Sequence, residues 1–384
     1  MKKNKKKRAG RWGRLLVSLC FVVIGAFCGV WIAQFLEETQ LSGRPVLEQV
    51  LLVALLLFLL YVAMLLQIIL HEAGHLVAGL LTGYRFGSFR VGGWMWLRTD
   101  GKLRCRRLSL LGTGGQCLMI PPEMRDGKFP YVLYNLGGSL MNLLTGALFL
   151  LLHGLLRGLP AVSLFCAMLS ATGFGFALIN GIPLRLGAIN NDGCNARELG
   201  KDPEALRSLW VQLKITEQAA RGGRLRDMPE AWFALPAWEQ MDNSMTAALA
   251  VFRVNWLMDR HQFVEAKDLI DEILERPNRV LGLHQGLLQC EQLFLALMAG
   301  EDQARIDAIC TRGLQKFMRQ MRRYPSVIRT GYAYARLRLR DSQLADRLLE
   351  QFQHCERTYP YQGDLEGERE LLELVKVRAE ETAG

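Results

Sequence analysis

The residues best suited to chemistry lie in the stretch LQIILHEAGHLVAG, which is strongly apolar and yet contains two histidines and one glutamate. On a helix, His71 and His75 are four residues apart and project from the same face, so both imidazoles can reach one ion. Glu72 is displaced by about 100° around the helix axis, close enough to act on a water at that ion without being a ligand. The spacing therefore predicts a metal site with an adjacent general base.

The apolar surroundings strengthen this interpretation. Three ionisable groups within five positions of a membrane helix are costly unless they share a partner, and a metal ion supplies one. A purely structural hydrogen-bonded cluster is the alternative. HExxH is the pattern of zinc metallopeptidases, and a hydrolytic zinc site needs three protein ligands with one position open for water. A third ligand is therefore expected elsewhere in the chain.

Asp192, in the stretch NGIPLRLGAINNDG, is the favoured third ligand. It follows the last apolar segment and so returns to the membrane face at which the HEAGH helix emerges. Cys194 is the competing ligand. His153 lies at the far end of the third apolar segment, nearly a membrane thickness away, which argues against it. The remaining histidines belong to the polar C-terminal region.

Four apolar segments are long enough to hold these residues in a membrane, at 1.5 Å of helix rise per residue and roughly 30 Å of hydrocarbon. The first exceeds the core of a typical signal peptide, about 7 to 15 residues, and is interpreted as a retained anchor. The predicted spans are residues 15–35, 46–83, 131–152 and 161–182. An even number of spans brings both termini to the same side.

Loop charges predict which side that is. The first 14 residues hold eight lysines and arginines of a chain whose net charge is +10, and residues 84–130 hold nine. The other two connections hold one arginine each. Both termini and residues 84–130 are therefore expected in the cytoplasm. The remaining charge is nearly balanced, so no nucleic-acid partner is predicted. Nine cysteines without a CxxC pair fit a reducing environment.

The loop 84–130 has strand character of its own. SFRVGGWMWLRTDGKLRCRRLSL favours a β-hairpin that turns at Asp100-Gly101, with Trp94 and Trp96 near the lipid headgroups. A strand within Ser88–Leu111 is expected to capture an unwound peptide by edge pairing.

Beyond about Asn195 the sequence becomes amphipathic and charged. Turn-like pairs about 40 residues apart favour stacked helical hairpins, either tetratricopeptide-like or a generic bundle. These pairs are Arg260-His261, Gly300-Glu301 and Arg340-Asp341. The chain is thus predicted to be a mainly α, multi-pass protein of the cell membrane. Its expected parts are a basic N-terminus (1–14), a membrane domain (15–194) and a cytoplasmic helical domain (195–384).

The region Leu51–Asn195 resembles the site-2 protease family of intramembrane zinc metalloproteases. The resemblance rests on HEAGH in a hydrophobic segment, on the glycine-rich span GGSLMN, and on Asn180-x-x-Pro183 followed by Asp192-Gly193. It implies that His71, His75 and Asp192 bind Zn²⁺, that Glu72 is the general base, and that Asn180 lies near the scissile bond.

One spacing departs from that family. Eight residues separate Pro183 from Asp192, where the family commonly has about four, and this bears on Asp192 rather than on the histidines. The resemblance implies an intramembrane zinc metalloendopeptidase with membrane protein substrates in the lipid bilayer, and a helical tail that offers a site for a cytoplasmic protein partner.

Two other functions remain open from the sequence. A non-catalytic metal-binding scaffold would not need Glu72 as a base. A metal transporter would need more polar residues along the spans than the few neutral ones present.

Overall fold

The computed structural model describes residues 2–40, 43–99, 102–108, 114–186, 189–241, 244–276 and 282–382. The chain divides into two compact units. The first comprises Met1–Gly92 with Thr113–Pro203, and the second comprises Gly93–Gly112 with Glu204–Gly384. Each unit has its own helices and strands.

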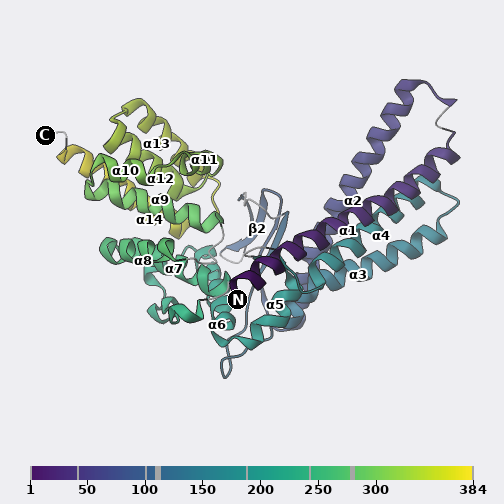
Figure 1. Ribbon diagram of the computed structural model, residues 1–384, viewed down its shortest axis with the longest axis horizontal. Coiled ribbons are helices and arrows are strands. Elements are labelled where there is room, and N and C mark those ends of the chain that lie inside the picture. The colour runs from purple at the N-terminus through teal and green to yellow at the C-terminus, as the bar shows by residue number, and fades with distance from the viewer. Residues whose placement is uncertain are drawn as a thin grey trace. The chain divides into compact units, whose positions relative to one another are not determined.

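Four long apolar helices form most of the first unit (Figure 1). They are α1 (Lys2–Glu38), α2 (Val46–Leu81), α3 (Val132–Leu155) and α4 (Pro160–Gly181). All four are long and apolar enough to cross a membrane, which confirms the four spans expected from the sequence. Many leucine, valine and phenylalanine side chains on α1 and α2 are exposed, as expected for surfaces that contact lipid rather than water.

Helices α2 and α3 approach each other through their backbones. A methyl group added at Gly74 would meet the carbonyl of Gly137, and one added at Gly137 would meet the carbonyl of Gly74. Further along α3, Gly146 lies against Phe174 of α4. Small residues allow such close packing inside a membrane, where helices gain little from apolar burial alone. The glycines of GGSLMN therefore bring α3 against the HEAGH helix.

The first unit also contains short strands. Strands β1 (Arg85–Val91) and β4 (Gly115–Ile120) pair antiparallel, with Phe89 opposite Cys117 and an irregularity between Phe86 and Ser88. After α4, β5 (Arg185–Leu186) and β6 (Ile189–Asn190) form a two-residue ladder. The short helices α5 (Asp192–Glu198) and η2 (Leu199–Lys201) follow it.

The second unit contains the expected hairpin. Strands β2 (Trp94–Thr99) and β3 (Lys102–Arg107) pair antiparallel, with Trp96 opposite Cys105. The Asp100-Gly101 turn lies outside the described residues. Met95 packs within the helical core of this unit, and the backbone N–H of Arg107 donates to the carbonyl of Thr358 at 3.2 Å. The hairpin is thus attached to the helical tail by both packing and hydrogen bonding.

The rest of the second unit is helical (Figure 1). The longer helices are α6 (Pro203–Ala220), α7 (Ser244–Asp259), α8 (Phe263–Glu275), α9 (Gly282–Ala299), α13 (Ser342–Glu356) and α14 (Gln362–Glu381). The shorter ones are α10 (Gln303–Ile309), α11 (Arg312–Gln320), α12 (Pro325–Ala333), η3 (Leu225–Asp227), η4 (Glu230–Phe233), η5 (Trp238–Gln240) and η6 (Tyr334–Leu339).

The three turns expected in the tail separate helices. His261, Gly300 and Arg340 have positive φ angles of 58°, 69° and 54° and lie between successive helices. A positive φ interrupts a right-handed helix, so these positions mark its ends. The helical character of the tail is confirmed, whereas its relation to tetratricopeptide repeats stays a prediction.

Candidate metal centre

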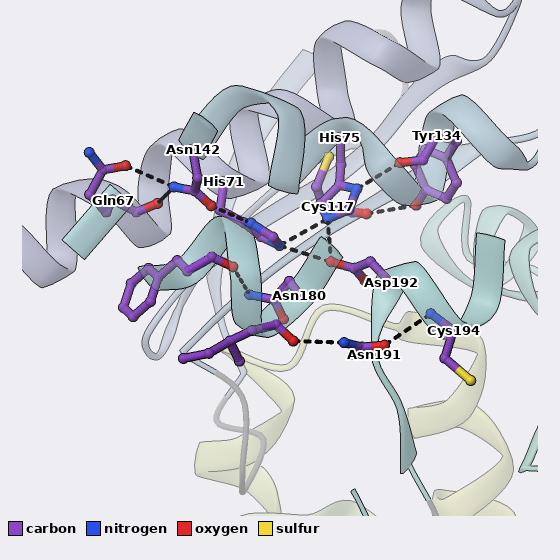
Figure 2. A network of polar contacts seen from close by, with 12 residues as sticks. Gln67, His71, His75, Cys117, Tyr134, Asn142, Asn180, Asn191, Asp192 and Cys194 are labelled. Atoms are coloured by element: carbon purple, nitrogen blue, oxygen red, sulfur yellow. Dashed lines mark hydrogen bonds and ion pairs between the residues drawn. The ribbon is translucent and has the colours of Figure 1, made fainter. Parts of the chain in front are cut away.

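Helix α2 presents the two histidines of HEAGH to one point. The Nε2 atoms of His71 and His75 lie 3.2 Å apart, because residues four apart share a helix face. Asp192, at the start of α5, completes the group: its Oδ2 lies 3.1 Å from His71 Nε2 and 3.5 Å from His75 Nε2. The structure thus brings together the three residues that the sequence proposed as metal ligands (Figure 2).

The imidazoles are oriented by hydrogen bonds at their other nitrogens. His75 Nδ1 lies 2.7 Å from the backbone carbonyl of Tyr134, and His71 Nδ1 lies 2.6 Å from Oδ1 of Asn142. A carbonyl oxygen can only accept, so each Nδ1 must carry the proton in a neutral ring. Each Nε2 is then left with a lone pair directed at the other histidine and at Asp192.

This arrangement suits a cation. Two lone pairs and a carboxylate oxygen that face one another repel unless a positive charge lies between them. Zn²⁺ binds histidine nitrogen and carboxylate oxygen at about 2.0 to 2.2 Å, which separates tetrahedral ligand atoms by about 3.3 to 3.5 Å. The observed separations of 3.1, 3.2 and 3.5 Å match that spacing. The donor set therefore fits zinc.

The charge state of Asp192 agrees with a ligand role. Burial alone would raise the pKa of its carboxyl group, but the neighbouring His71 and His75 hold that pKa well below its usual range. The carboxylate is consequently anionic at neutral pH.

The long connection between Pro183 and Asp192 is folded back on itself. Arg185 pairs with Asn190 in the β5–β6 ladder, so the additional residues form a small excursion and the chain returns close to the end of α4. The spacing that differs from the site-2 protease pattern therefore does not displace Asp192.

Asn191 holds this excursion closed through all four of its side-chain bonds. Its Nδ2 donates to the carbonyls of Ile179 and Ile182 at 2.7 and 2.6 Å. Its Oδ1 accepts from the backbone N–H groups of Leu184 and Cys194, both at 2.9 Å. The bond from Cys194 caps the N-terminus of α5. One amide thus joins the end of α4 to the start of the helix that carries Asp192.

The close packing of α5 on α4 explains why a glycine, Gly193, follows Asp192. A methyl group added at Gly193 would meet the carbonyl of Gly181 and would lie 3.1 Å from the carbonyl of Asn180. The first turn of α5 therefore rests directly on the last turn of α4. This close approach needs a residue without a side chain.

The other candidates are not part of the group formed by the three ligands. Cys194 is buried but is not part of the metal-binding group found among the described residues, and its thiol points away from the imidazoles in Figure 2. His153 bonds to Ser163 between α3 and α4. Asn180 donates from Nδ2 to the carbonyl of Phe176 in its own helix at 3.2 Å.

Glu72 is buried beside the histidines and rests against β4. A methyl group added at Gly115 would lie 2.7 Å from Glu72 Oε1, and the backbone N–H of Cys117 donates to the Glu72 carboxylate. The hydroxyl of Tyr134 donates to the carbonyl of Cys117 at 2.8 Å. The outer edge of β4 therefore faces the metal centre and orients the expected base.

Cys117 contributes its backbone rather than its thiol. Burial, together with the nearby Glu72 carboxylate, raises the pKa of the Cys117 thiol to about 12. The thiol is protonated at neutral pH and is not a nucleophile.

Several residues that support the site were not identified as such from the sequence. They are Gln67, Tyr134, Asn142 and Asn191. Gln67 and Asn142 carried a usable signal, because a polar side chain within an apolar helix needs an internal partner. Tyr134 uses its backbone carbonyl on His75, and Asn191 acts through three-dimensional closure of a loop, so neither had a pattern to detect.

Comparison with known families agrees with this geometry. Residues 46–177 match the family model described as Peptidase M50B-like, which belongs to the site-2 protease family. The match confirms the resemblance for the segment that contains His71, Glu72 and His75, and it ends before Asn180 and Asp192. No curated protein and no solved structure matches the chain.

The close packing of α3 on His71 gives a first prediction. A methyl group at Gly138 would lie 2.5 Å from both Cε1 and Nε2 of His71, so Gly138→Ala should displace the imidazole and lower zinc affinity by about tenfold or more. Gly146→Ala, on the same helix but against Phe174, is the matched control and should keep its zinc. The measurement is zinc content and chelator competition of the purified proteins, and normal affinity in Gly138→Ala would contradict the geometry.

The choice between the two candidate third ligands gives a second prediction. Asp192→Ala removes one of three converging ligand atoms and should abolish stoichiometric zinc binding, because the remaining two histidines leave the ion exposed. Cys194→Ala should retain zinc. Elemental analysis after dialysis against a weak chelator distinguishes them, and the reverse pattern would assign the site to Cys194.

Proposed function

We propose that the protein is an intramembrane zinc metalloendopeptidase that hydrolyses peptide bonds in or near transmembrane segments of membrane protein substrates. The observation that carries the proposal is the convergence of His71 Nε2, His75 Nε2 and Asp192 Oδ2, with Glu72 beside them, on a helix long and apolar enough to span a membrane. The family match over residues 46–177 supports a metalloprotease of the membrane.

The proposed chemistry divides between the ion and the chain. When bound, Zn²⁺ supplies Lewis acidity, which acidifies water and polarises a carbonyl group. Glu72 accepts the proton of the attacking water and delivers it to the leaving amide nitrogen. The N–H of Cys117 holds the Glu72 carboxylate in place for both transfers. His71, His75 and Asp192 hold the ion throughout.

Asn180 is assigned to the substrate. One N–H of its amide donates to the carbonyl of Phe176, and an amide nitrogen carries a second N–H that can donate to another carbonyl oxygen. We propose that this N–H donates to the substrate backbone or to the oxyanion that develops during attack. Such a hydrogen bond stabilises the transition state by about 3 kcal/mol.

The edge of β4 is the proposed substrate-binding strand. A transmembrane helix must unwind before its amides can be attacked, and an unwound segment needs new backbone partners. The backbone of Cys117 shows that the outer edge of β4 faces the centre, and Gly115 lies next to Glu72. From the sequence, the strand that captures the peptide was expected within Ser88–Leu111. We propose β4 instead, which begins just after that range at Gly115.

The loop charges carry the proposed orientation. Both termini and the basic residues between α2 and α3 are placed in the cytoplasm by the positive-inside rule. In that orientation the helical region from about residue 195 onward is a cytoplasmic domain, and we propose that it binds a cytoplasmic protein partner.

Removal of the base separates the protease from a metal-binding scaffold. Glu72→Gln should lower cleavage of a reconstituted single-span substrate by about 10² to 10⁴-fold, because proton transfer is lost. Zinc should stay bound, since the ligands are unchanged. Cleavage is followed by gel mobility and mass of the products. Wild-type cleavage rates in Glu72→Gln would instead favour the non-catalytic scaffold.

The orientation is tested with reporters. A periplasm-type or lumenal reporter inserted after Gly43, between α1 and α2, should be active as an external fusion. The same reporter joined after Gly384 should be inactive, and a cytoplasmic reporter there should be active. The opposite pattern would overturn the topology and with it the cytoplasmic position of the tail.

A further inference from the structure

A chain of two buried amides, Gln67 and Asn142, leads to His71 at the metal centre (Figure 2). Gln67 lies one turn before His71 on α2, and both Gln67 and Asn142 of α3 are fully buried. Gln67 Nε2 donates to the backbone carbonyl of Leu169 on α4 at 2.9 Å. Asn142 Nδ2 donates to Gln67 Oε1 at 2.8 Å and to the Gln67 carbonyl at 2.9 Å.

The chemistry of these groups leaves one arrangement. The carbonyl of Leu169 can only accept, so the nitrogen of the Gln67 amide must point to it and the oxygen must point to Asn142. Asn142 must then donate with its nitrogen, which leaves its oxygen 2.6 Å from His71 Nδ1. That oxygen also only accepts, so His71 carries its proton on Nδ1 and keeps the Nε2 lone pair for a metal.

The surroundings are shaped for this chain. Thr145 donates a second hydrogen bond to Gln67 Oε1 at 3.2 Å, which favours the same orientation of the amide. A methyl group added at Gly173 of α4 would lie 2.9 Å from Gln67 Nε2, so a glycine makes room for the amide. A buried amide without such partners would cost about 1 to 3 kcal/mol for each unmade hydrogen bond.

The two histidines reach the same state by different routes. His75 bonds directly to the backbone carbonyl of Tyr134, which cannot rotate. His71 bonds to a side-chain amide, whose oxygen and nitrogen can exchange places. A reversed Asn142 would present N–H groups to Nδ1 and stabilise the tautomer with its proton on Nε2, which cannot bind a metal. Two acceptors on residue 67 favour one orientation of Asn142: its backbone carbonyl and its side-chain oxygen, each of which accepts from Asn142 Nδ2.

We propose that Gln67 is a positioning residue that, through Asn142, fixes the metal-binding tautomer of His71 from the backbone carbonyl of Leu169. This inference rests on the proposed metal site but not on proteolysis. Gln67 touches neither ligand atoms nor substrate, and its effect passes entirely through the orientation of Asn142. Mutation of a residue that hydrogen-bonds to a metal-bound histidine typically lowers metal affinity by about 10- to 100-fold.

The first experiment compares zinc affinities in the Glu72→Gln background, where cleavage plays no part. Gln67→Leu keeps about the size of the side chain but removes the side-chain oxygen that accepts from Asn142, leaving only the backbone carbonyl of residue 67 as an acceptor, and it should weaken zinc binding by about 10- to 100-fold. Thr172→Val is the control: it removes an equally buried hydroxyl that bonds to Met168 and Leu169 within α4, and it should leave zinc affinity unchanged. Full-length proteins in detergent are titrated by chelator competition.

The second experiment separates positioning from packing. A carboxyl group at position 142 can accept from His71 without an orienting partner, so Gln67→Leu combined with Asn142→Asp should recover zinc affinity to within a few-fold of the parent. A role in packing alone predicts no recovery, because a second buried polar change would add to the first. The absorption spectrum of the cobalt-substituted protein should likewise return to the parental form only in the double variant.

The outcomes are distinct from those for the proposed function. Unchanged zinc affinity in Gln67→Leu, or no recovery in the double variant, would overturn the positioning role. If the Glu72→Gln protein, the parent of these variants, binds zinc but the wild type cleaves no substrate, the proposed protease activity is refuted and the comparison of zinc affinities remains valid. A parent without zinc would refute both.

Discussion

Three electron-rich atoms pointed at one another within an apolar protein segment are the constraint on which the rest of the first unit depends. His71 Nε2, His75 Nε2 and Asp192 Oδ2 lie 3.1 to 3.5 Å apart. Without a cation this geometry is repulsive, and without rigid support it would open. The surrounding helices and strands can be understood as the means of holding these atoms together until an ion neutralises them.

The support comes from backbone as much as from side chains. Gly74 and Gly137 let α2 and α3 meet directly, and Gly193 lets α5 rest on the end of α4. Carbonyls of Tyr134 and, through two amides, of Leu169 set the protons of the two imidazoles. Backbone groups cannot rotate freely or titrate at neutral pH, so they fix a ligand more firmly than a flexible side chain does.

The loop between α2 and α3 divides its strands between different tasks. Strand β4 pairs with β1 and presents its outer edge to Glu72, whereas the β2–β3 hairpin packs with the helical tail. A basic loop that looked continuous in sequence thus contains two strands that belong to the first unit and two that belong to the second.

Much of the chemistry was readable from local pattern. The spacing of His71, Glu72 and His75 follows from the helix repeat, and the apolar runs fix the four long helices because length and composition alone decide whether a helix can span a membrane. The three turns in the tail and the two strands around Asp100-Gly101 were also predicted, since each depends on residues close in sequence. The ends of α2, α3 and α4 agreed with the predicted spans to within a few residues, whereas α1 begins at Lys2, well before the predicted start at residue 15.

What lies far apart in sequence was decided only by the tertiary structure. The sequence by itself determined that two histidines and a glutamate share a membrane helix, and it left Asp192 and Cys194 as rivals across an unusually long connection. Whether that connection displaces Asp192 depends on Asn191 closing it by four hydrogen bonds. The tautomer of His71 likewise depends on two long-range hydrogen bonds. His71 and Asn142 are 71 positions apart in the sequence, and Gln67 and Leu169 are 102 positions apart. Such bonds have no sequence period, because their partners meet only when the helices pack.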